Sequence, residues 1–581
     1  MYAEKCEVLV IGAGPAGLAA ASCCAHEGFK VLVVDSGDSI DKRDRLDPFH
    51  LIQGVGGAGL FSDGKLSYYP SSHSLWALPA KHILEAGFNW VHMLMSDLVD
   101  EKPNFPKIKF SHRWHHSPSK SEFKNKKYAS VQLSQEQSIE LAYRLSLPIK
   151  HRVKLNSKVV KISGSNSSYI VDVDENDSAY QIETEQIIFA GGRFGAKKLL
   201  ELLPDLKTTF RRFEFGVRIE QPESDFFLKD FDTIDTKLIS RSENGTIEWR
   251  TFCCCRDGKV IRTSGNDLPT TFSGTTWEKS SFSNIGFNTR LLDPGIVAEN
   301  AEEVNALLNG DVQPFSLPLA DFIDKSTAGV LDGVLGDFLR EGLLRLSQQY
   351  SLEGAMIHGP CIEGTGYYPR LSANLETQMK GVYVAGDSTG IFRGLLPSLL
   401  SGYYVAKNAC MRKHTAEEQV KSGVTIKRSS IKTMPMIFTA QSKKFFYCRD
   451  AICEFVFKQN NLPINPFRVF DYFLSDRVPR DMVRRGNNHL VRACDELWVF
   501  GPIADGVLFE VIYAMNISKP IRFFTIGNRV DEIKPLTDIK EVQFEPEVHA
   551  SRQTRKQLLD EIKLAFTTYQ DHAPQLELEF D

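Results

Sequence analysis

Apolar and polar positions follow two different periods along this chain. Near both ends, short continuous apolar runs such as Val8–Ile11 and 496–500 precede a turn that holds glycine, and a helix-like pattern follows the turn. Continuous apolar runs are typical of parallel strands buried on both faces. Between these regions, segments such as 210–222, FRRFEFGVRIEQP, alternate with the period of two of a half-buried strand. The pattern therefore predicts two α/β regions with an antiparallel sheet between them.

The first α/β region opens with CEVLVIGAGPAGLAAASCCAHEGFKVLVVDSG, residues 6–37. The run Val8–Ile11 predicts a strand, and the alanine-rich stretch after it predicts a helix that ends at about Glu27. A second strand is expected over Val31–Val34, directly before Asp35. This is the order of elements in a βαβ unit that binds a dinucleotide.

The turn of this unit has the spacing GxGxxG. Gly12 permits the tight turn, Gly14 lets the backbone approach a pyrophosphate, and Gly17 lets the helix pack closely on the strand. The positive N-terminal end of the helix faces the phosphate charge. Asp35, 18 residues after Gly17, is placed to hydrogen-bond a ribose diol. Dinucleotide binding is predicted here, the alternative being a tight packing turn.

Two later stretches distinguish FAD from NAD through a resemblance. QIIFAGGRFGAKKLL (186–200) and GVYVAGDSTGIFRGLLPSLLSGYYVA (381–406) resemble segments of two-dinucleotide-binding-type flavoproteins. The resemblance implies that Asp387 binds the ribitol chain of FAD. It also implies that the helix after Asp387 directs its N-terminus at the flavin pyrimidine edge, which favours the anionic reduced flavin.

The most specific stretch is GVGGAGLFSDGKLSYY (54–69). With FGVRIE (215–220) and RTFCCC (250–255) it is similar to a family of bacterial FAD-dependent dehydrogenases, over roughly residues 5–410. The resemblance implies that the loop from Gly56 runs along the pyrophosphate and brings Ser62, Asp63 and Lys65 near the reacting face. No second GxGxxG with a strand and an acid follows, so NAD(P)H is expected at most as a transient electron donor. The expected cofactor-binding residues are Gly12, Gly14, Pro15, Ala16, Gly17, Asp35, Gly56, Gly57, Ala58, Gly59, Ser62, Val160, Gly191, Gly192, Gly386, Asp387, Arg393, Gly394 and Leu395.

Candidate chemistry at the flavin comes from the loop and from the alternating middle segment. Such an insertion covers the isoalloxazine in flavoproteins of this layout, so Arg218 and Arg250 are expected to face the substrate. The expected catalytic residues of this half are Lys65, Arg250 and Cys253. His358 and Glu363, which precede the glycine–aspartate turn, could exchange protons with a substrate or serve as structural hydrogen-bonding groups.

The run Cys253–Cys255 has two interpretations. It could be a thiol relay beside the flavin, but adjacent strand residues point to opposite faces and in-line residues are badly placed for a disulfide. Small apolar strand residues are the favoured interpretation. The group His112, His115 and His116 has local metal-like spacing without an accompanying acid or cysteine cluster, so a polar loop is favoured and no metal site is expected.

The second α/β region begins after a polar, lysine-rich stretch. Strands alternate with helices in it, which implies a parallel sheet with its ligand outside the carboxyl ends of the strands. Roughly residues 434–530 resemble the nucleoside 2-deoxyribosyltransferase superfamily, in PINPF (463–467), in Asp495 and in DGVLFEVIYA (505–514). The resemblance implies that Glu510, four residues after Gly506, is the nucleophile of glycosyl transfer.

This region also departs from the superfamily pattern. Ala504 stands where a ligand-contacting acid is usual, and Asp505 is displaced by one. A binding module in which Glu510 accepts a sugar hydroxyl is therefore the alternative, and Asp495, Asp505 and Gly506 are expected to contact the ligand in either case. The group Arg477, Arg480, Arg484 and Arg485 could meet phosphates, although a solvated helix face is favoured.

Composition restricts the class of protein. A formal net charge of -4 gives no bulk attraction for nucleic acid or anionic membrane. No apolar run is long enough to span a bilayer, the start lacks the layout of a signal peptide, and the odd count of 11 cysteines favours reduced thiols, so a cytoplasmic location is expected. The expected architecture is α/β: a Rossmann-like FAD-binding domain in two parts (1–200 and 351–412), an inserted antiparallel-sheet substrate domain (201–350), a linker (413–432) and a small doubly wound α/β domain (433–581).

The favoured prediction is an FAD-dependent oxidoreductase fused to a domain that recognises a nucleoside or nucleotide. One alternative is an N-glycosidase or NAD(P)-cleaving hydrolase that uses Glu510, with the flavoprotein half as a redox sensor. Another is a binding or assembly protein that holds FAD structurally. The substrate is expected to be a small molecule in the first two cases.

Overall fold

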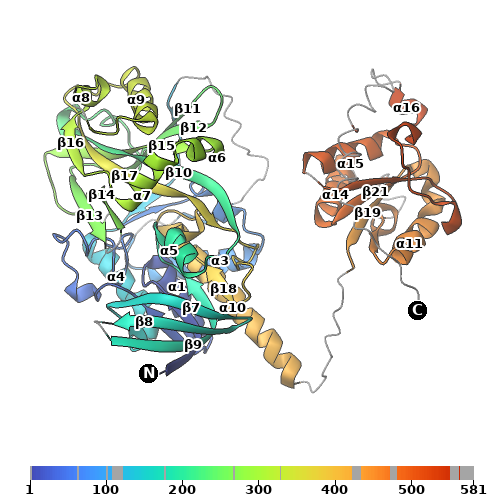
Figure 1. Ribbon diagram of the computed structural model, residues 1–581, viewed down its shortest axis with the longest axis horizontal. Coiled ribbons are helices and arrows are strands. Elements are labelled where there is room, and N and C mark those ends of the chain that lie inside the picture. Colours follow the sequence, from blue (N-terminus) through green and yellow to red (C-terminus); the bar gives the residue numbers. More distant parts are fainter. Residues whose placement is uncertain are drawn as a thin grey trace. The chain divides into compact units, whose positions relative to one another are not determined.

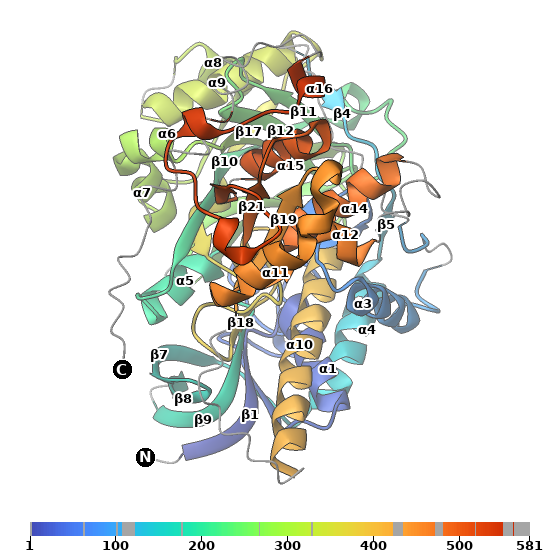
Figure 2. The ribbon, with the colours of Figure 1, turned by 90° about the vertical axis from the view of Figure 1, so that its right-hand side faces the viewer.

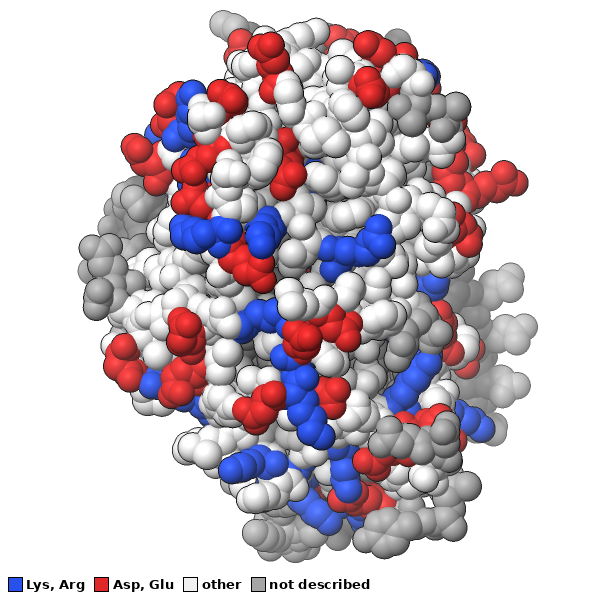
Figure 3. All heavy atoms as spheres, turned by 90° about the vertical axis from the view of Figure 1, so that its left-hand side faces the viewer, with Lys and Arg blue, Asp and Glu red and all other residues white. Residues whose placement is uncertain are grey.

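The computed structural model describes residues 3–61, 64–99, 103–106, 122–175, 178–265, 268–326, 329–421, 434–470, 480–517, 519–549 and 562. They belong to two compact units, 1–425 and 426–581 (Figure 1). None of the helices in these ranges is long and apolar enough to cross a membrane. On the face drawn in Figure 3, Lys and Arg side chains are interspersed with Asp and Glu.

The first sheet of unit 1 has seven strands in the order β6-β2-β1-β9-β8-β7, with β18 paired to β9. Strands β6, β2, β1, β9 and β18 are parallel, whereas β7, β8 and β9 form an antiparallel meander. The bounds are β1 (Ala3–Ile11), β2 (Val31–Val34), β6 (Val153–Lys154), β7 (Ser157–Ser165), β8 (Ser168–Glu175), β9 (Ser178–Phe189) and β18 (Val382–Val384). The predicted strand–helix–strand start is confirmed.

Alternate residues of β1 enter two different cores. Val8 and Val10 pack in a cluster with helices α1 (Pro15–His26) and α10 (Leu395–Lys421), while Leu9 and Ile11 pack against the meander and α5 (Gly195–Leu202). Figure 2 shows α10 running beside α1. Other elements of this region are α2 (His73–Trp76), α3 (Lys81–Leu94), α4 (Gln135–Ser146), β3 (Lys65–Ser67) and β5 (Ser130–Gln132).

The second sheet, here called the cap sheet, also has seven strands, in the antiparallel order β16-β17-β10-β15-β12-β11-β4. Its strands are β4 (Lys124–Asn125), β10 (Thr208–Pro222), β11 (Leu238–Arg241), β12 (Ile247–Cys255), β15 (Phe282–Leu291), β16 (Phe315–Pro318) and β17 (Met356–Pro369). The hairpin β13 (Lys259–Gly265) and β14 (Leu268–Thr275) packs against it, and its helices are α6 (Pro294–Glu299), α7 (Ala301–Asn309), α8 (Leu319–Ile323) and α9 (Val334–Ser347). Trp249 anchors α9, because its Nε1 donates to the carbonyl of Phe338 at 2.8 Å.

Two predicted boundaries differ from the structure. The cap sheet is not confined to 201–350, because it takes in β4 before that range and β17 after it. Strands that are far apart in the sequence can pair in one antiparallel sheet, and the pattern of apolar residues does not show which strands pair. The stretch 413–432 is not wholly a linker, since α10 continues to Lys421.

Unit 2 contains a four-stranded parallel sheet in the order β20-β19-β21-β22. Residues of β19 and β21 alternate between a core with α14 and α15 and a core with α11, so helices cover both faces, as predicted for a doubly wound fold. The bounds are β19 (Met436–Gln441), α11 (Arg449–Lys458), β20 (Leu462–Ile464), α12 (Pro466–Val469), α14 (Arg480–Ala493), β21 (Glu496–Phe500), α15 (Asp505–Asn516), β22 (Ile521–Phe524) and α16 (Pro546–His549).

Candidate functional site

The three glycines of the first turn have different surroundings. A Cβ added at Gly12, whose φ is +103°, would lie 2.5 Å from the carbonyl oxygen of Ala190, and one at Gly17 would lie 1.8 Å from that of Gly12. Both positions are filled by protein. A Cβ at Gly14 would instead find its nearest neighbour 3.9 Å away, at the Cα of Gly57. The space beside Gly14 is therefore open to a ligand, which fits the predicted pyrophosphate position.

Asp35 joins this turn to the second glycine loop. Its Oδ2 accepts the N–H of Ala13 at 2.6 Å, and its Oδ1 accepts the N–H groups of Gly37 at 2.8 Å and Gly54 at 3.0 Å. Because each carboxylate oxygen has two acceptor sites, Oδ2 can accept one further hydrogen bond from a ribose hydroxyl. The residue lies at the expected place at the end of β2.

The glycine loops predicted to bind the cofactor converge on this turn. The N–H of Gly56 donates to the carbonyl of Ala13 at 2.9 Å. A Cβ at Gly59 would lie 3.5 Å from the side chain of Leu395, and one at Gly386 would lie 2.9 Å from the Cβ of Ala16. The structure thus brings together the first turn, the loop that follows β2 and the start of α10.

Other predicted cofactor positions lie around the same turn or apart from it. Gly191 and Gly192 follow β9 after one residue, Ala190, and β9 pairs with β1. Val160 is 49% exposed at a bulge of β7 between Val159 and Lys161. Ser62 and Asp63 lie outside the described residues, as do His112, His115 and His116.

Arg43, which the sequence analysis did not single out, holds the second glycine loop. Its Nη1 donates to the carbonyls of Val55 at 2.8 Å and Gly57 at 3.1 Å. Burial lowers the pKa of Arg43 to about 9, an effect that Asp35 opposes. No local sequence signal distinguishes this arginine, because its partners are backbone groups.

Arg393 connects the glycine–aspartate turn with the cap sheet. Its Nη1 lies 2.9 Å from Glu214 of β10 and 2.8 Å from Glu363 of β17, and its Nε lies 3.3 Å from Asp387. Burial by itself would lower the pKa of Arg393, but Asp387, Glu363 and Glu214 raise it above its ordinary value. Glu363, predicted either to exchange protons or to be structural, is buried and also lies 2.8 Å from Arg193.

Glu214 is the most enclosed carboxylate of this region. Its side chain is 1% exposed and forms ion pairs with Arg212, Arg290 and Arg393. Burial alone would raise its pKa, but Arg290 and the other arginines hold the pKa well below the ordinary value. The signal in the sequence is a charged residue between two phenylalanines of an apolar strand, FEF, which calls for a buried partner.

A group of cations, here called the cation cluster, continues from Glu214 along the cap sheet. It consists of Lys126, Lys237, Arg250 and Arg290. Arg290 lies 3.1 Å and Arg250 3.7 Å from Glu248 of β12. The sequence analysis expected Arg250 to face the substrate. It did not single out Lys126 or Lys237.

The two lysines of the cation cluster titrate below their ordinary range. Burial lowers the pKa of Lys126 to about 8, and Arg250 lowers it further while Glu248 opposes the change. Burial and then Arg250 also lower the pKa of Lys237. His73 lies 3.3 Å from Lys126, and burial followed by Lys126 and Lys237 lowers its pKa to about 4. Burial and the neighbouring cations therefore both disfavour the charged form of these groups.

Tyr128 and Asp235 border this cluster. The Tyr128 hydroxyl donates to Asp235 at 2.7 Å, and the Lys237 ammonium lies 5.4 Å from the centre of the Tyr128 ring. Burial and the Asp235 carboxylate raise the pKa of Tyr128, so this phenol keeps its proton. The proton of Tyr128 is held by Asp235, which fixes the phenol beside the cations.

Arg218 does not face an open substrate site, contrary to the prediction. Its side chain is 1% exposed, and its Nη2 donates to the carbonyl of Cys253 at 2.9 Å and to the side-chain oxygen of Asn284. The alternation of β10 turns position 218 into the interior because the cap sheet is covered on both faces there. Lys65 is buried too, with its ammonium donating to the carbonyl of Cys254.

His358 occupies a hydrogen-bonded position of β17. Its Nδ1 lies 2.8 Å from the Ser316 hydroxyl and its Nε2 lies 3.3 Å from Glu220. Both ring nitrogens are engaged by neighbouring strands. Of its two predicted roles, the structure favours the structural one.

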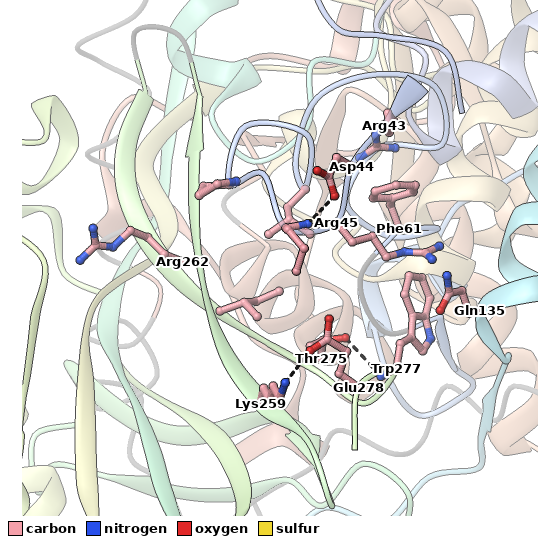
Figure 4. A pocket seen from close by; sticks show the side chains of 14 residues that line it. Arg43, Asp44, Arg45, Phe61, Gln135, Lys259, Arg262, Thr275, Trp277 and Glu278 are labelled. Atoms are coloured by element: carbon pink, nitrogen blue, oxygen red, sulfur yellow. Dashed lines mark hydrogen bonds and ion pairs between the residues drawn. The ribbon is translucent and has the colours of Figure 1, made fainter. Parts of the chain in front are cut away.

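A cavity of about 620 Å³ lies between the loop after β2 and the β13–β14 hairpin (Figure 4). The Arg45 guanidinium stands between two rings, 4.6 Å from the centre of Phe61 and 4.4 Å from that of Trp277. Its Nε and Nη2 and the Trp277 Nε1 are buried without a hydrogen-bond partner. Lys259 and Arg262 of the hairpin also line the cavity, where Lys259 pairs with Glu278. This cavity suits an anionic ligand with a flat ring.

In unit 2, Glu510 is a buried carboxyl of α15. It is 8% exposed and accepts a hydrogen bond from Asn487 of α14 at 2.7 Å. Burial raises its pKa to about 7, against the effect of Asn487. Asp505, the first residue of α15, is exposed and lies 3.8 Å from Arg484. A Cβ added at Gly506 would meet nothing within 4 Å, so the start of this helix is open.

Asp495 is not placed with these residues. It stands at the amino end of β21, where its carboxylate accepts the N–H of Met436 at 2.7 Å. Asp505, Gly506 and Glu510 follow the carboxyl end of the same strand. The prediction that Asp495 contacts the ligand is wrong for that reason, since parallel strands place ligands at their carboxyl ends. Arg477 and the side chain of Arg480 lie outside the description, and Arg484 is half exposed.

Comparison with known proteins gives two family matches. Residues 7–42 match an FAD binding domain, and residues 438–524 match a domain of unknown function, DUF7768. An uncharacterized protein of Clostridium beijerinckii is 23% identical over 471 residues, which cover 70% of this chain and 80% of that protein. The first match spans the βαβ unit with the open space beside Gly14, so the cofactor of this unit is FAD, as predicted.

Solved structures similar to this chain include several flavoproteins. A flavoprotein/dehydrogenase from Cytophaga hutchinsonii is 16% identical, covers 70% of this chain and 79% of its own, and has a TM-score of 0.35. A geranylgeranyl bacteriochlorophyll reductase-like protein from Thermoplasma acidophilum is 12% identical, covers 72% of this chain and 84% of its own, and has a TM-score of 0.32.

Among the described residues, no group of three His, Cys, Asp or Glu is arranged to hold a metal ion.

Proposed function

We propose that this protein is an FAD-dependent oxidoreductase whose unit 1 acts on a small anionic compound. The observation that supports the substrate class is the cation cluster of Lys126, Lys237, Arg250 and Arg290. Bound FAD would supply two-electron redox chemistry. The residues of the chain would bind and orient the substrate and exclude water.

The pKa values of the lysines carry the argument for an anion. Burial and neighbouring cations make the protonated form of Lys126 costly, which lowers its pKa to about 8. An anionic group placed between Lys126 and Arg250 would remove this cost, because an opposite charge favours the charged form. Arg250 can bind a carboxylate in a bidentate manner. Small carboxylates are therefore the substrate class that fits best.

The experiment measures the binding of small mono- and dicarboxylates to the oxidised holoprotein through changes in the flavin spectrum. Lys126→Met and Arg250→Met are expected to weaken the binding of every carboxylate that perturbs the spectrum by at least tenfold. Lys124→Met is the matched control, because Lys124 is exposed on the neighbouring strand. Equal affinities in all variants would refute the anionic substrate.

The electron donor follows from the cavity around Arg45. We propose that a nicotinamide nucleotide docks there, with its phosphates near the arginine side chains that line the cavity and a ring beside Trp277. Addition of NADH or NADPH without oxygen should bleach the flavin absorbance. If neither nucleotide bleaches it, the flavin is reduced by the substrate itself.

A second function is proposed for unit 2, the binding of a nucleoside or nucleotide at the start of α15. The supporting observation is Glu510, a buried carboxyl whose pKa is raised to about 7 and whose hydrogen-bond partner is Asn487. Such a group can accept a sugar hydroxyl, or attack an anomeric carbon when ionised.

Incubation with nucleosides, nucleotides and NAD(P) separates the two roles of Glu510. Release of free base that Glu510→Ala abolishes would support glycosyl chemistry, with the flavin half as a sensor. Binding without cleavage, weakened in the same variant, would support recognition. The absence of both would refute the proposal for unit 2, and a flavin inert to every donor would favour a structural role for FAD.

A further inference from the structure

Arg218 is a charged residue in the interior of the cap sheet without a carboxylate beside it. Its side chain is 1% exposed, and its Nε has no hydrogen-bond partner. Within the described ranges, its contacts are the carbonyl of Cys253 and the side-chain oxygen of Asn284, and no Asp or Glu forms an ion pair with it. A guanidinium keeps its charge in a protein, so burial at this position is costly and a negative partner would reduce the cost.

The groups around Arg218 that can supply negative charge are thiols. Burial alone would lower the pKa of Arg218, but Cys253, Cys255 and Cys361 raise it. Burial raises the pKa of Cys361 to about 12, and its Sγ lies 3.3 Å from the carbonyl of Phe272, to which it donates. Cys361 therefore stays protonated, which leaves Cys253 and Cys255 as partners of the guanidinium.

A second cation, Lys65, lies close to Cys255. The ammonium of Lys65, which is buried, lies 3.9 Å from the Sγ of Cys255 and donates to the carbonyl of Cys254. A carboxylate beside this pair, Asp235, accepts from the backbone N–H of Cys254 at 3.3 Å and from Tyr128. Positive neighbours favour the thiolate, the reactive form of cysteine.

The backbone brings the two sulfurs together. Cys253 has a φ of +51°, and the pairing of β12 with β15 is interrupted by a bulge between Phe252 and Cys255. The Sγ atoms of Cys253 and Cys255 lie 4.0 Å apart. In a regular strand, in-line residues stand roughly 7 Å apart. The sequence analysis considered a disulfide unfavourable because it assumed a regular strand. The strand is not regular at Cys253–Cys255.

We propose that Cys253 and Cys255 form a redox-active dithiol that exchanges an electron pair with the FAD of the same unit. In the oxidation, both S–H bonds break and one S–S bond forms, and the two electrons and two protons pass to oxidised FAD. Lys65 connects the pair to the cofactor side, because it follows the glycine loop that contacts the first turn. This inference requires FAD but not the anionic substrate.

The first experiment counts thiols in the holoprotein. Treatment with diamide, followed by denaturation and alkylation, is expected to show two fewer thiols, and the peptide that spans 253–255 should lose the mass of two hydrogen atoms. Cys361→Ser should keep this loss, because Cys361 is not part of the pair. Retention of both thiols, or a disulfide that joins other cysteines, would overturn the proposal.

The second experiment tests the exchange with FAD without any substrate. Anaerobic reduction of diamide-treated holoprotein with dithionite should consume four electrons per FAD, against two for Cys253→Ser. The two thiols should appear before the flavin is fully bleached. A disulfide that persists beside reduced flavin would overturn the exchange. Since no substrate is present, that outcome leaves the proposed anionic substrate untouched.

Discussion

The guanidinium of Arg393 lies 2.9 Å from the carboxylate of Glu214. Arg393 stands just before α10, at the glycine–aspartate turn, whereas Glu214 lies in β10 of the cap sheet. The pair therefore connects the FAD side of unit 1 with the sheet that carries the cation cluster. Because the carboxylate is buried among several arginines, its loss would leave uncompensated positive charge.

Glu214→Gln is expected to lower the free energy of unfolding by roughly 3 kcal/mol, since removal of one partner of a buried pair is strongly destabilising. The pKa of Glu214 is held below its ordinary value. Its contribution is therefore present above the unfolded pKa and is lost as the pH falls through the lower folded pKa. Urea unfolding at pH 7 and in acid measures both effects. Glu243→Gln, at an exposed turn position, is the control and should change little.

The glycines of the first turn predict opposite outcomes. Gly14→Ala should leave the fold intact, because the added Cβ has no neighbour nearer than 3.9 Å. It should nonetheless weaken FAD binding at least tenfold, because the methyl group fills the space of the ligand. Gly12→Ala should impair folding, since its φ of +103° and the 2.5 Å approach to Ala190 both exclude a side chain. FAD content after gel filtration measures the loss of binding, and circular dichroism measures the loss of folding. Stable FAD binding by Gly14→Ala would contradict the assignment of the pyrophosphate site beside Gly14.

The sequence predicted the βαβ unit and the unit 2 sheet because their signals are local. Gly12 and Asp35 are fixed by spacing within one unit, and both were found where expected. Glu214 could not be assigned because two of its three arginine partners, Arg290 and Arg393, lie far away in the sequence. The position of Asp495 before its strand was expected, but the ligand contact carried over from the resemblance was wrong because parallel sheets bind ligands at the carboxyl ends of their strands. The bulge at Cys253 was missed because a run of identical residues carries no sign of a change in backbone direction.

Lys126 predicts a pH dependence of substrate binding. Its pKa in the folded protein is lowered to about 8. Below that pH the lysine is charged and favours an anion, and above it the charge is lost, so the affinity for a carboxylate should fall as the pH rises through about 8. Flavin difference spectra between pH 6 and 9 measure this fall. Lys126→Met should bind weakly with a flat profile; an unchanged profile would assign the titration to another group.

Substitution of Arg45 tests whether NAD(P)H docks in the cavity around this residue. Arg45→Gln removes the positive charge and the ring-stacked guanidinium from the cavity in Figure 4. The rate of flavin reduction at low NAD(P)H is expected to fall at least tenfold, with little change at saturation, because binding rather than chemistry is affected. Arg152→Gln, outside this cavity, is the control. Stopped-flow reduction without oxygen gives both values, and an equal loss in the control would refute the docking site.

Glu510 gives unit 2 a pH-dependent stability. Its pKa is raised from 4.5 to about 7 by burial. Between these values the folded protein holds a proton that the unfolded chain has released, so stability should fall as the pH rises from 4.5 to 7. The difference in pKa corresponds to about 3 kcal/mol. Glu510→Gln keeps a side-chain oxygen for the hydrogen bond from Asn487 but cannot ionise, so its unit 2 transition should be flat over this range. Thermal unfolding of the full chain, followed by tryptophan fluorescence, measures the effect, and parallel curves for both proteins would show that Glu510 stays ionised.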